Sequence, residues 1–175
     1  MVRVLIVDDS AFFRKLLKDL LTEDEEIVVV GEAKNGEDAL KKIPLLKPDV
    51  ITLDIEMPYM DGITTLKHIV SDYNIPVIML SSFTTEGATM TIKALEEGAV
   101  DFIPKPSNIF SISGEDLRAD IINKIKVAAK CNLGSKSYGI YKRDRKSLNE
   151  MSNITGKSEF EYVIAIGTST GGPRA

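Results

Sequence analysis

Short runs of β-branched and aliphatic residues alternate with longer segments that carry an apolar stripe, and this alternation constrains the fold more than any other feature. The runs are typical of buried strands, and they occupy residues 2–7, 27–30, 50–53, 77–80 and 101–103. The intervening segments have the apolar spacing of amphipathic helices, and they cover residues 12–21, 35–43, 63–71, 85–97 and 117–128. Strands that alternate with helices form a parallel sheet covered on both faces. We therefore expect an α/β domain with five strands and five helices.

One asparagine and several prolines mark the expected ends of these elements. Asn35 is a candidate N-cap for the second helix, because its side chain can accept a hydrogen bond from the first turn. Pro44 and Pro48 are expected to bracket the loop after this helix. Pro104 is expected to end the fifth strand, since proline has no backbone N–H to donate to a neighbouring strand.

Charge is distributed unevenly along the chain, and this predicts a boundary near residue 129. Residues 1–129 carry 14 basic and 22 acidic side chains, a net charge of −8, which disfavours nucleic-acid binding. Residues 130–159 carry 7 basic and 3 acidic side chains, a net charge of +4, and show no helical or strand periodicity. We interpret this second segment as a solvated, basic linker.

Neither a membrane segment nor an export signal is expected. The longest aliphatic runs fall far short of the roughly 18 residues that a membrane span needs. Asp8 and Asp9 follow the first strand at once, which is untypical of a signal peptide. The sequence contains one cysteine, Cys131, so no internal disulfide can form. These features predict a cytoplasmic protein.

Polar and charged side chains follow four of the predicted strands. They are Asp8, Asp9, Asp54, Ser81 and Lys105. Ligands of open parallel sheets bind at the carboxyl ends of the strands, so we expect these groups to meet in one crevice. Clustered carboxylates repel one another and favour a divalent cation such as Mg²⁺. Together with a lysine and a hydroxyl, they describe a site at which a carboxylate accepts a phosphoryl group. Each acid alone could instead be a helix cap or a turn residue, and only the full set favours the site.

Five short segments contain the strand-end residues and their neighbours. They are Leu-Ile-Val-Asp-Asp-Ser at 5–10, Leu-Asp-Ile-Glu-Met-Pro at 53–58, Met-Asp-Gly at 60–62, Leu-Ser-Ser at 80–82 and Asp-Phe-Ile-Pro-Lys-Pro at 101–106. Together they resemble the receiver domain of bacterial two-component response regulators. The resemblance covers about residues 1–129. It implies a flavodoxin-like, doubly wound sheet in strand order 2-1-3-4-5.

The resemblance also implies roles for the acidic residues. Asp54 matches the aspartate that a histidine kinase phosphorylates. Asp8 and Asp9 match the acidic pair that binds Mg²⁺ together with Asp54. The backbone carbonyl of Glu56 matches the remaining protein ligand of the metal.

Three further residues match the family's switch machinery. Lys105 matches the lysine that contacts the phosphoryl group, and Ser81 matches the hydroxyl switch residue. Phe102 matches the aromatic switch position. Pro104 departs from the family pattern, because it removes a backbone donor between Phe102 and Lys105.

The last 16 residues predict the beginning of another domain. Residues 160–166 form a strand pattern, and Gly-Thr-Ser-Thr-Gly at 167–171 follows it. A lone strand cannot bury itself, so we interpret residues 160–175 as the start of a second α/β domain. The G-x-S-x-G pattern fits a nucleophile elbow that exposes Ser169. It fits equally a glycine-rich nucleotide loop in which Ser169 caps a helix.

The order of receiver, basic linker and the segment Ile-Ala-Ile-Gly-Thr-Ser-Thr-Gly-Gly at 164–172 resembles the chemotaxis protein-glutamate methylesterase family, of the CheB type. The resemblance implies that Ser169 is the nucleophile of a C-terminal esterase, which phosphorylation of the receiver releases from inhibition. The esterase would demethylate receptor glutamates and deamidate receptor glutamines. Its implied partners are a chemotaxis histidine kinase, methyl-accepting receptors and its own receiver. The matching catalytic histidine and aspartate have no counterpart here, so we predict no useful esterase activity for these 175 residues.

Two other functions remain open from the sequence. The chain can be a stand-alone receiver that acts as a phosphorylation-switched protein-binding module. It can also be a receiver joined to a nucleotide-binding domain that starts at residue 160. A DNA-binding regulator is disfavoured, because residues 160–172 begin with a strand and no helix-turn-helix pattern follows.

Overall fold

The computed structural model describes residues 1–82, 84–105 and 115–131. The strands are β1 (Val2–Val7), β2 (Ile27–Ala33), β3 (Val50–Asp54), β4 (Val77–Ser81) and β5 (Asp101–Pro104). The helices are α1 (Ala11–Thr22), α2 (Gly36–Leu46), α3 (Gly62–Asp72), α4 (Thr85–Glu96) and α5 (Glu115–Lys130). All strand pairs are parallel, and the order in the sheet is β2-β1-β3-β4-β5. The predicted fold class and strand order are confirmed.

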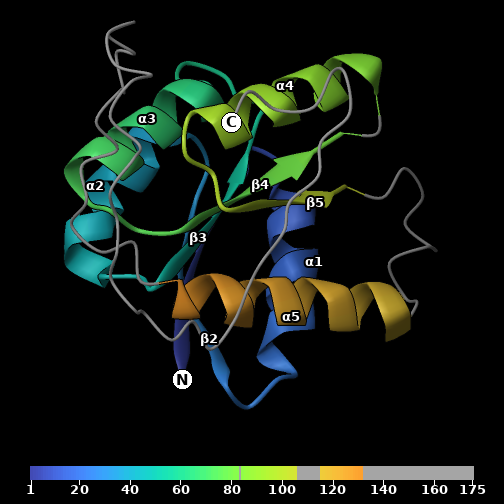
Figure 1. Cartoon of the computed structure of the whole chain (residues 1–175). Helices are drawn as coiled ribbons and strands as arrows, with labels where there is room; N and C mark the ends of the chain where they lie inside the picture. Colours follow the sequence, from blue (N-terminus) through green and yellow to red (C-terminus); the bar gives the residue numbers. More distant parts are fainter. Residues whose placement is uncertain (83, 106–114, 132–175) are drawn as a thin grey trace, which may run out of the picture. The chain divides into compact units, whose positions relative to one another are not determined.

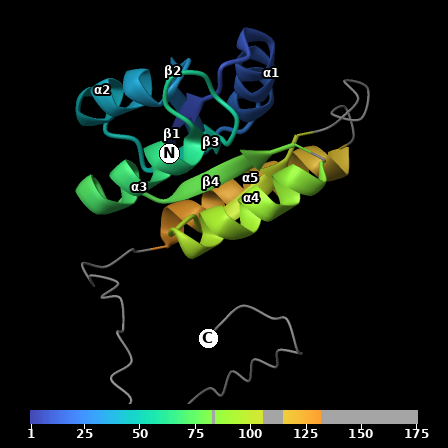
Figure 2. The same ribbon diagram turned by 90° about the horizontal axis from the view of Figure 1, so that it is seen from above.

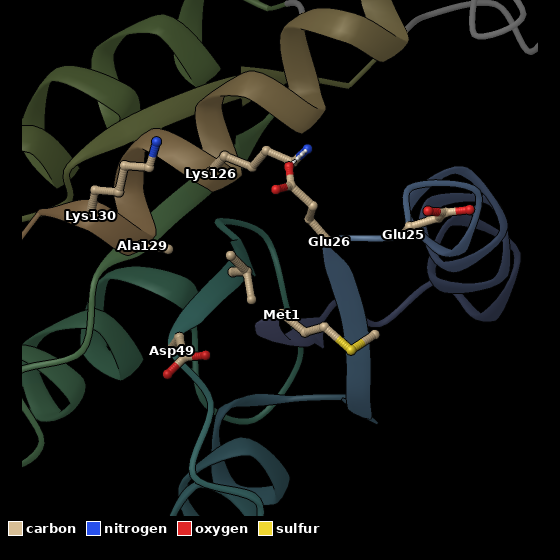
Figure 3. A pocket seen from close by; sticks show the side chains of 8 residues that line it. Met1, Glu25, Glu26, Asp49, Lys126, Ala129 and Lys130 are labelled. Atoms are coloured by element: carbon tan, nitrogen blue, oxygen red, sulfur yellow. Dashed lines mark hydrogen bonds and ion pairs between the residues drawn. The ribbon is translucent and has the colours of Figure 1, made fainter.

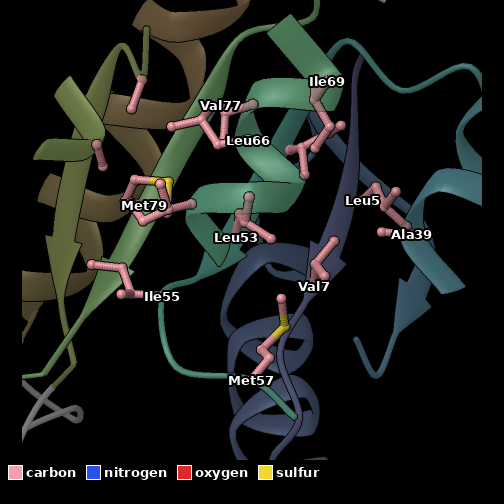
Figure 4. Close-up of a cluster of buried hydrophobic side chains, with 14 of the residues drawn as sticks. Leu5, Val7, Ala39, Leu53, Ile55, Met57, Leu66, Ile69, Val77 and Met79 are labelled. Carbon is pink, nitrogen blue, oxygen red and sulfur yellow. The ribbon is translucent and has the colours of Figure 1, made fainter. Parts of the chain in front are cut away.

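Successive residues of each strand point to opposite faces of the sheet, and each face carries its own hydrophobic cluster. On β1, Leu5 and Val7 belong to the first cluster, whereas Val4 and Ile6 belong to the second. The first cluster receives buried side chains from α2, α3 and α4, as Figure 4 shows in close-up. The second receives them from α1 and α5. The two helix layers lie on opposite sides of the sheet in Figure 1, and in Figure 2, which looks from above, α4 of one layer lies in front of α5 of the other.

Four helices begin with a side chain that caps the first turn. The capping residues are Ser10, Asn35, Asp61 and Thr84, and each accepts a hydrogen bond from the backbone N–H three residues later. Such caps satisfy donors that have no partner within the helix. The predicted role of Asn35 is thereby confirmed. Each cap fixes the point at which the loop after a strand enters the next helix.

The expectation that Pro44 lies in a loop is wrong, because α2 continues through it to Leu46. Ile43 is buried in the first cluster and Leu46 packs against that cluster. These apolar contacts extend the helix, although the proline removes one intrahelical hydrogen bond. The helix ends at Lys47, which adopts a left-handed conformation with φ 44°.

Pro104 is the last residue of β5 and pairs with Ser81, so the strand extends one residue further than expected. The backbone N–H of Lys105 donates to the Ser81 carbonyl at 2.7 Å. Because backbone donors alternate in direction along a strand, the missing donor of Pro104 falls on the open edge of the sheet. An edge strand tolerates proline in this position.

None of the helices in the described part of the chain is long and apolar enough to cross a membrane. Most of the predicted linker, the predicted strand at 160–166 and Ser169 lie outside the described residues. The carboxyl ends of β1, β3, β4 and β5, which carry the other predicted site residues, lie within them.

Candidate functional site

Two acidic residues meet where β1 and β3 end. Val7 pairs with Leu53 in the parallel register, so Asp8 and Asp54 follow directly on adjacent strands. Asp8 is fully buried and Asp54 is 4% exposed, whereas Asp9 faces solvent. Each of the three carboxylates offers one oxygen, and these oxygens lie within 4.8 Å of one another. The three acids that the sequence proposed as metal ligands are therefore brought together.

Lys105 reaches this acidic cluster from the end of β5. Its Nζ lies 2.7 Å from Asp8 Oδ2 and 2.8 Å from Asp54 Oδ2, so one ammonium group pairs with both buried acids. The ammonium also lies 4.9 Å from the centre of the Phe13 ring, a cation–π distance. The backbone bond from Lys105 to Ser81 anchors the start of this side chain on β4.

The remaining hydrogen bonds orient the acids without neutralising them. Asp8 Oδ1 accepts from the backbone N–H of Ser10 at 2.8 Å, and Asp54 Oδ1 accepts from that of Glu56 at 3.4 Å. The Arg14 guanidinium donates to the backbone carbonyls of Asp8 and Asp9 at 2.8 and 3.1 Å. Arg14 therefore holds the loop after β1, and its own ion pair is with Glu32. We did not single out Arg14 from the sequence, where it is one of several basic residues on α1.

The cluster carries an excess of negative charge. The pKa of Asp54 is raised to about 6, because burial and, to a smaller extent, the nearby Asp8 raise it more than Lys105 lowers it. Burial lowers the pKa of Lys105, but its bonds to Asp54 and Asp8 outweigh this, so its pKa lies above the usual value. Asp8 Oδ2 is buried, and within the described residues it forms the Lys105 ion pair but no hydrogen bond of good geometry. Closely spaced, anionic oxygen ligands of this kind suit a hard divalent cation.

The Ser81 hydroxyl turns toward helix α4. Its Oγ lies 3.2 Å from the Gly87 carbonyl and 2.7 Å from the Thr91 hydroxyl, and both partners belong to α4. Ser81 is 5% exposed, at the carboxyl end of the strand next to β3. Thr91 was not predicted from the sequence. The only signal for it there is a polar residue on the face of α4 that packs against the sheet.

The two remaining predicted residues of this region, Phe102 and Glu56, contact neighbouring elements. Phe102 lies on β5 with 38% of its surface exposed, and its ring lies 5.2 Å from Lys124 Nζ on α5. Glu56 follows β3, and its carboxylate accepts from the Ser82 hydroxyl at 3.3 Å. This contact connects the loop after β3 with the loop after β4.

A pocket of about 360 Å³ lies away from the acidic cluster, near the amino end of β1 and the last turn of α5 (Figure 3). Its lining includes Met1, Glu25, Glu26, Asp49 and Lys126. Lys126 is paired with Asp24 and Glu26. None of the predicted site residues lines this pocket, and we assign no function to it.

The sheet order and the acidic cluster with its lysine define a class of protein, the phosphoacceptor module of two-component signalling. A family model described as the response regulator receiver domain matches residues 4–114. The chain belongs to this family.

Individual relatives narrow the class. The response regulator domain of Thermotoga maritima CheB is 47% identical with a TM-score of 0.65, and the match covers 74% of this chain and 96% of that one. A Bacillus subtilis protein-glutamate methylesterase/protein-glutamine glutaminase is 46% identical over 183 residues. That match covers 100% of this chain and 50% of the relative, so the chain spans about half the length of the curated relatives it matches. The resemblance to CheB-type receivers is thereby confirmed.

A third relative was solved as a CheX–CheY–BeF3–Mg²⁺ complex from Borrelia burgdorferi. It is 36% identical with a TM-score of 0.60, and the match covers 72% of this chain and 87% of that one.

Proposed function

We propose that this chain is the receiver part of a chemotaxis methylesterase and that Asp54 accepts a phosphoryl group from a histidine kinase. The observation that carries the proposal is the position of Asp54, buried at the end of β3 between two further acids and the Lys105 ammonium. Asp8, Asp9, Asp54 and the backbone carbonyl of Glu56 would hold Mg²⁺. When bound, the metal would offset negative charge on the transferred group.

The chain's own residues then have distinct tasks. An oxygen of the Asp54 carboxylate attacks phosphorus, and the bond to the donor nitrogen breaks as the new P–O bond forms. Lys105, which already contacts Asp54 Oδ2, would hold a phosphoryl oxygen by charge and hydrogen bonding. The Ser81 hydroxyl would donate to another phosphoryl oxygen. Phe102 would respond to the moved Ser81 loop and alter the surface formed by α4, β5 and α5.

The domain organisation is part of the same proposal. Residues 1–129 would form the receiver, 130–159 a basic linker and 160–175 the beginning of the catalytic domain. Ser169 would attack receptor glutamate methyl esters and the corresponding glutamine amides. Phosphorylation would relieve the receiver's inhibition of this esterase in the cytoplasm. Relatives named as methylesterase/glutaminase at 46% identity support this reading.

Phosphorylation of the purified 175-residue chain by a small phosphoryl donor tests the receiver chemistry. With acetyl phosphate and Mg²⁺, the unmodified chain should acquire a phosphoryl group, detected as a retarded band on a phosphate-affinity gel. Asp54→Asn should show no such band. Asp72→Asn removes an exposed acid on α3 and should behave like the unmodified chain. Equal phosphorylation of Asp54→Asn would exclude Asp54 as the acceptor.

Ester hydrolysis tests the second half of the proposal. We expect the 175-residue chain to have no useful esterase activity, because its one histidine, His68, lies half exposed on α3 and faces Asp72. A protein extended by the rest of its gene should hydrolyse methylated receptor glutamates, faster after phosphorylation, and Ser169→Ala should abolish this. Ester hydrolysis by the short chain that Ser169→Ala removes would contradict the expectation.

A further inference from the structure

The hydroxyl of Ser81 belongs to a small buried hydrogen-bond set on α4. The Thr91 Oγ1 lies 2.7 Å from Ser81 Oγ and 2.7 Å from the Gly87 carbonyl. The Ser81 Oγ lies 3.2 Å from the same carbonyl. Ser81 and Thr91 are 5% and 6% exposed, so water cannot readily replace these partners.

The two hydroxyl protons can be arranged in two ways. In the first, Thr91 donates to Ser81 Oγ, and Ser81 donates to the Gly87 carbonyl. In the second, Thr91 donates to the Gly87 carbonyl, and Ser81 shares that carbonyl or donates to the Ser82 carbonyl at 3.4 Å. Each hydroxyl has one proton to donate, and in both arrangements the proton of Ser81 goes to a nearby backbone carbonyl.

Gly87 makes the set geometrically tight. A Cβ at this position would lie 2.4 Å from the Ser82 carbonyl oxygen, closer than real Cβ atoms approach. The Thr84 side chain caps the same turn by accepting from the Gly87 N–H at 2.9 Å. Ser82 is in turn bonded to Glu56. The first turn of α4 is therefore held close to the end of β4, which places both oxygen partners within reach of Ser81.

We propose that Thr91 is a positioning residue that holds the Ser81 hydroxyl toward α4 and thereby opposes its movement to a phosphoryl group on Asp54. The proposal rests on the function proposed above. A donor bond from Ser81 to a phosphoryl oxygen requires its present donor bond to break, while Thr91 can keep its bond to the Gly87 carbonyl. Thr91 thus shifts the equilibrium between two arrangements of Ser81, and its hydroxyl sets how easily the receiver responds.

Titration of the full 175-residue chain with Mg²⁺ and BeF3⁻, an analogue of the aspartyl phosphoryl group, tests this. Thr91→Val keeps the shape of the side chain and removes the hydroxyl, and Thr91→Ser keeps the hydroxyl. By NMR, Thr91→Val should bind BeF3⁻ roughly three- to tenfold more tightly, as expected for the loss of about one hydrogen bond that favours the other state. Affinity for Mg²⁺ alone should stay unchanged. Thr91→Ser should match the unmodified chain within about twofold for both ligands.

The outcomes separate this proposal from the one on which it rests. A merely structural role for Thr91 would weaken BeF3⁻ binding or leave it unchanged, and either result in a folded Thr91→Val would overturn the proposal alone. If Thr91→Val does not fold, Thr91→Ala replaces it, and this variant should likewise bind BeF3⁻ more tightly with unchanged affinity for Mg²⁺. An unmodified chain that shows no response to BeF3⁻ and Mg²⁺ at Asp54 would overturn the receiver function and the role of Thr91 with it.

Discussion

The Asp54 carboxyl combines deep burial with two other acids and one lysine. Burial favours its neutral form and Lys105 favours its ionised form, and the net result is a pKa raised to about 6. A carboxylate whose charge is costly in the folded protein is stabilised more by a bound cation than an exposed carboxylate is. When no cation is bound, the buried, ionised Asp54 destabilises the folded protein.

Asp54→Asn should therefore stabilise the metal-free protein at neutral pH. In the unfolded chain the group loses its proton near the ordinary pKa of 3.8, and in the folded chain only near 6. The contribution of Asp54 to stability should fall as pH rises from about 4 to about 6 and stay level above that. The variant removes this loss, so its free energy of unfolding at pH 7 should be higher by about 2–3 kcal/mol. Urea unfolding followed by circular dichroism between pH 4 and 8, with chelator present, measures it.

Asp9→Asn provides the control, because Asp9 belongs to the same cluster but faces solvent. Its effect should stay within roughly 0.5 kcal/mol, as for other exposed positions. A stability of the unmodified chain that rises between pH 4 and 6, together with a destabilised Asp54→Asn, would contradict the assigned electrostatics.

Lys105→Met should lower the free energy of unfolding, whereas Asp54→Asn should raise it. The change leaves Asp8 and Asp54 buried without their shared counter-charge, which typically costs on the order of 3 kcal/mol. The loss should grow as pH rises from 5 to 7, because the Asp54 carboxyl, which can keep a proton at the lower pH, must then be charged. The same unfolding experiment measures it. Lys15→Met removes an exposed i,i+4 pair with Asp19 on α1 and should change stability by less than about 0.5 kcal/mol. Equal losses in both variants would argue against the buried double ion pair.

At the scale of elements, helix α3 starts in direct contact with the end of strand β3, which it follows. The N–H of Gly62, the first residue of α3, donates to the Ile55 carbonyl at 2.9 Å. A Cβ on Gly62 would lie 2.1 Å from the Asp54 carbonyl oxygen and 2.7 Å from Ile55 Cα. Because these neighbours are backbone atoms, they cannot yield by a change of rotamer.

Gly62→Ala should therefore destabilise the protein by about 2–4 kcal/mol and weaken Mg²⁺ binding, since α3 must move away from the end of β3. Gly31→Ala is the matched comparison, because its Cβ would meet Leu46 Cδ1 at 2.4 Å, the end of a flexible side chain. That variant should lose less than about 1.5 kcal/mol and keep its Mg²⁺ affinity. Urea unfolding and an NMR titration with Mg²⁺ compare the two. If Gly31→Ala lost more stability or Mg²⁺ affinity than Gly62→Ala, the close contact between Gly62 and the end of β3 would not be what fixes the start of α3.

Element positions could be predicted well from local patterns, and the error at α2 comes from tertiary packing. Each strand begins where the sequence indicated, because burial on both faces requires continuous apolar residues. Helix α2 was cut short at Pro44, because the packing of Ile43 and Leu46 on the sheet is invisible to a rule about proline.

At the scale of the whole molecule, the receiver fold carries its own core. The residues of both hydrophobic clusters in the described structure, on either face of the sheet, fall between Val2 and Ala129. The described structure therefore builds a core on each face of the sheet from residues that precede the end of α5. A domain of this size normally folds by itself.

A fragment of residues 1–131 should accordingly unfold cooperatively, with a Tm within about 4 °C of that of the full chain. It should also take a phosphoryl group from acetyl phosphate at a similar rate. Differential scanning calorimetry and the phosphate-affinity gel measure both properties, and the full chain is the reference. Loss of a cooperative transition in the fragment would mean that residues beyond 131 contribute to the core.

The sequence by itself determined the succession of strands and helices and the residues that end each strand, because both depend on local composition and periodicity. It also singled out Asp8, Asp9, Asp54, Ser81 and Lys105, since parallel strands end at one edge and so gather their end residues. Only the tertiary structure decided that Lys105 pairs with both buried acids, that Asp54 is costly to ionise, and that Thr91 engages Ser81. These properties depend on distances of a few ångströms and on burial between residues far apart in the chain. They are set by how the helices pack on the sheet, which no local pattern specifies.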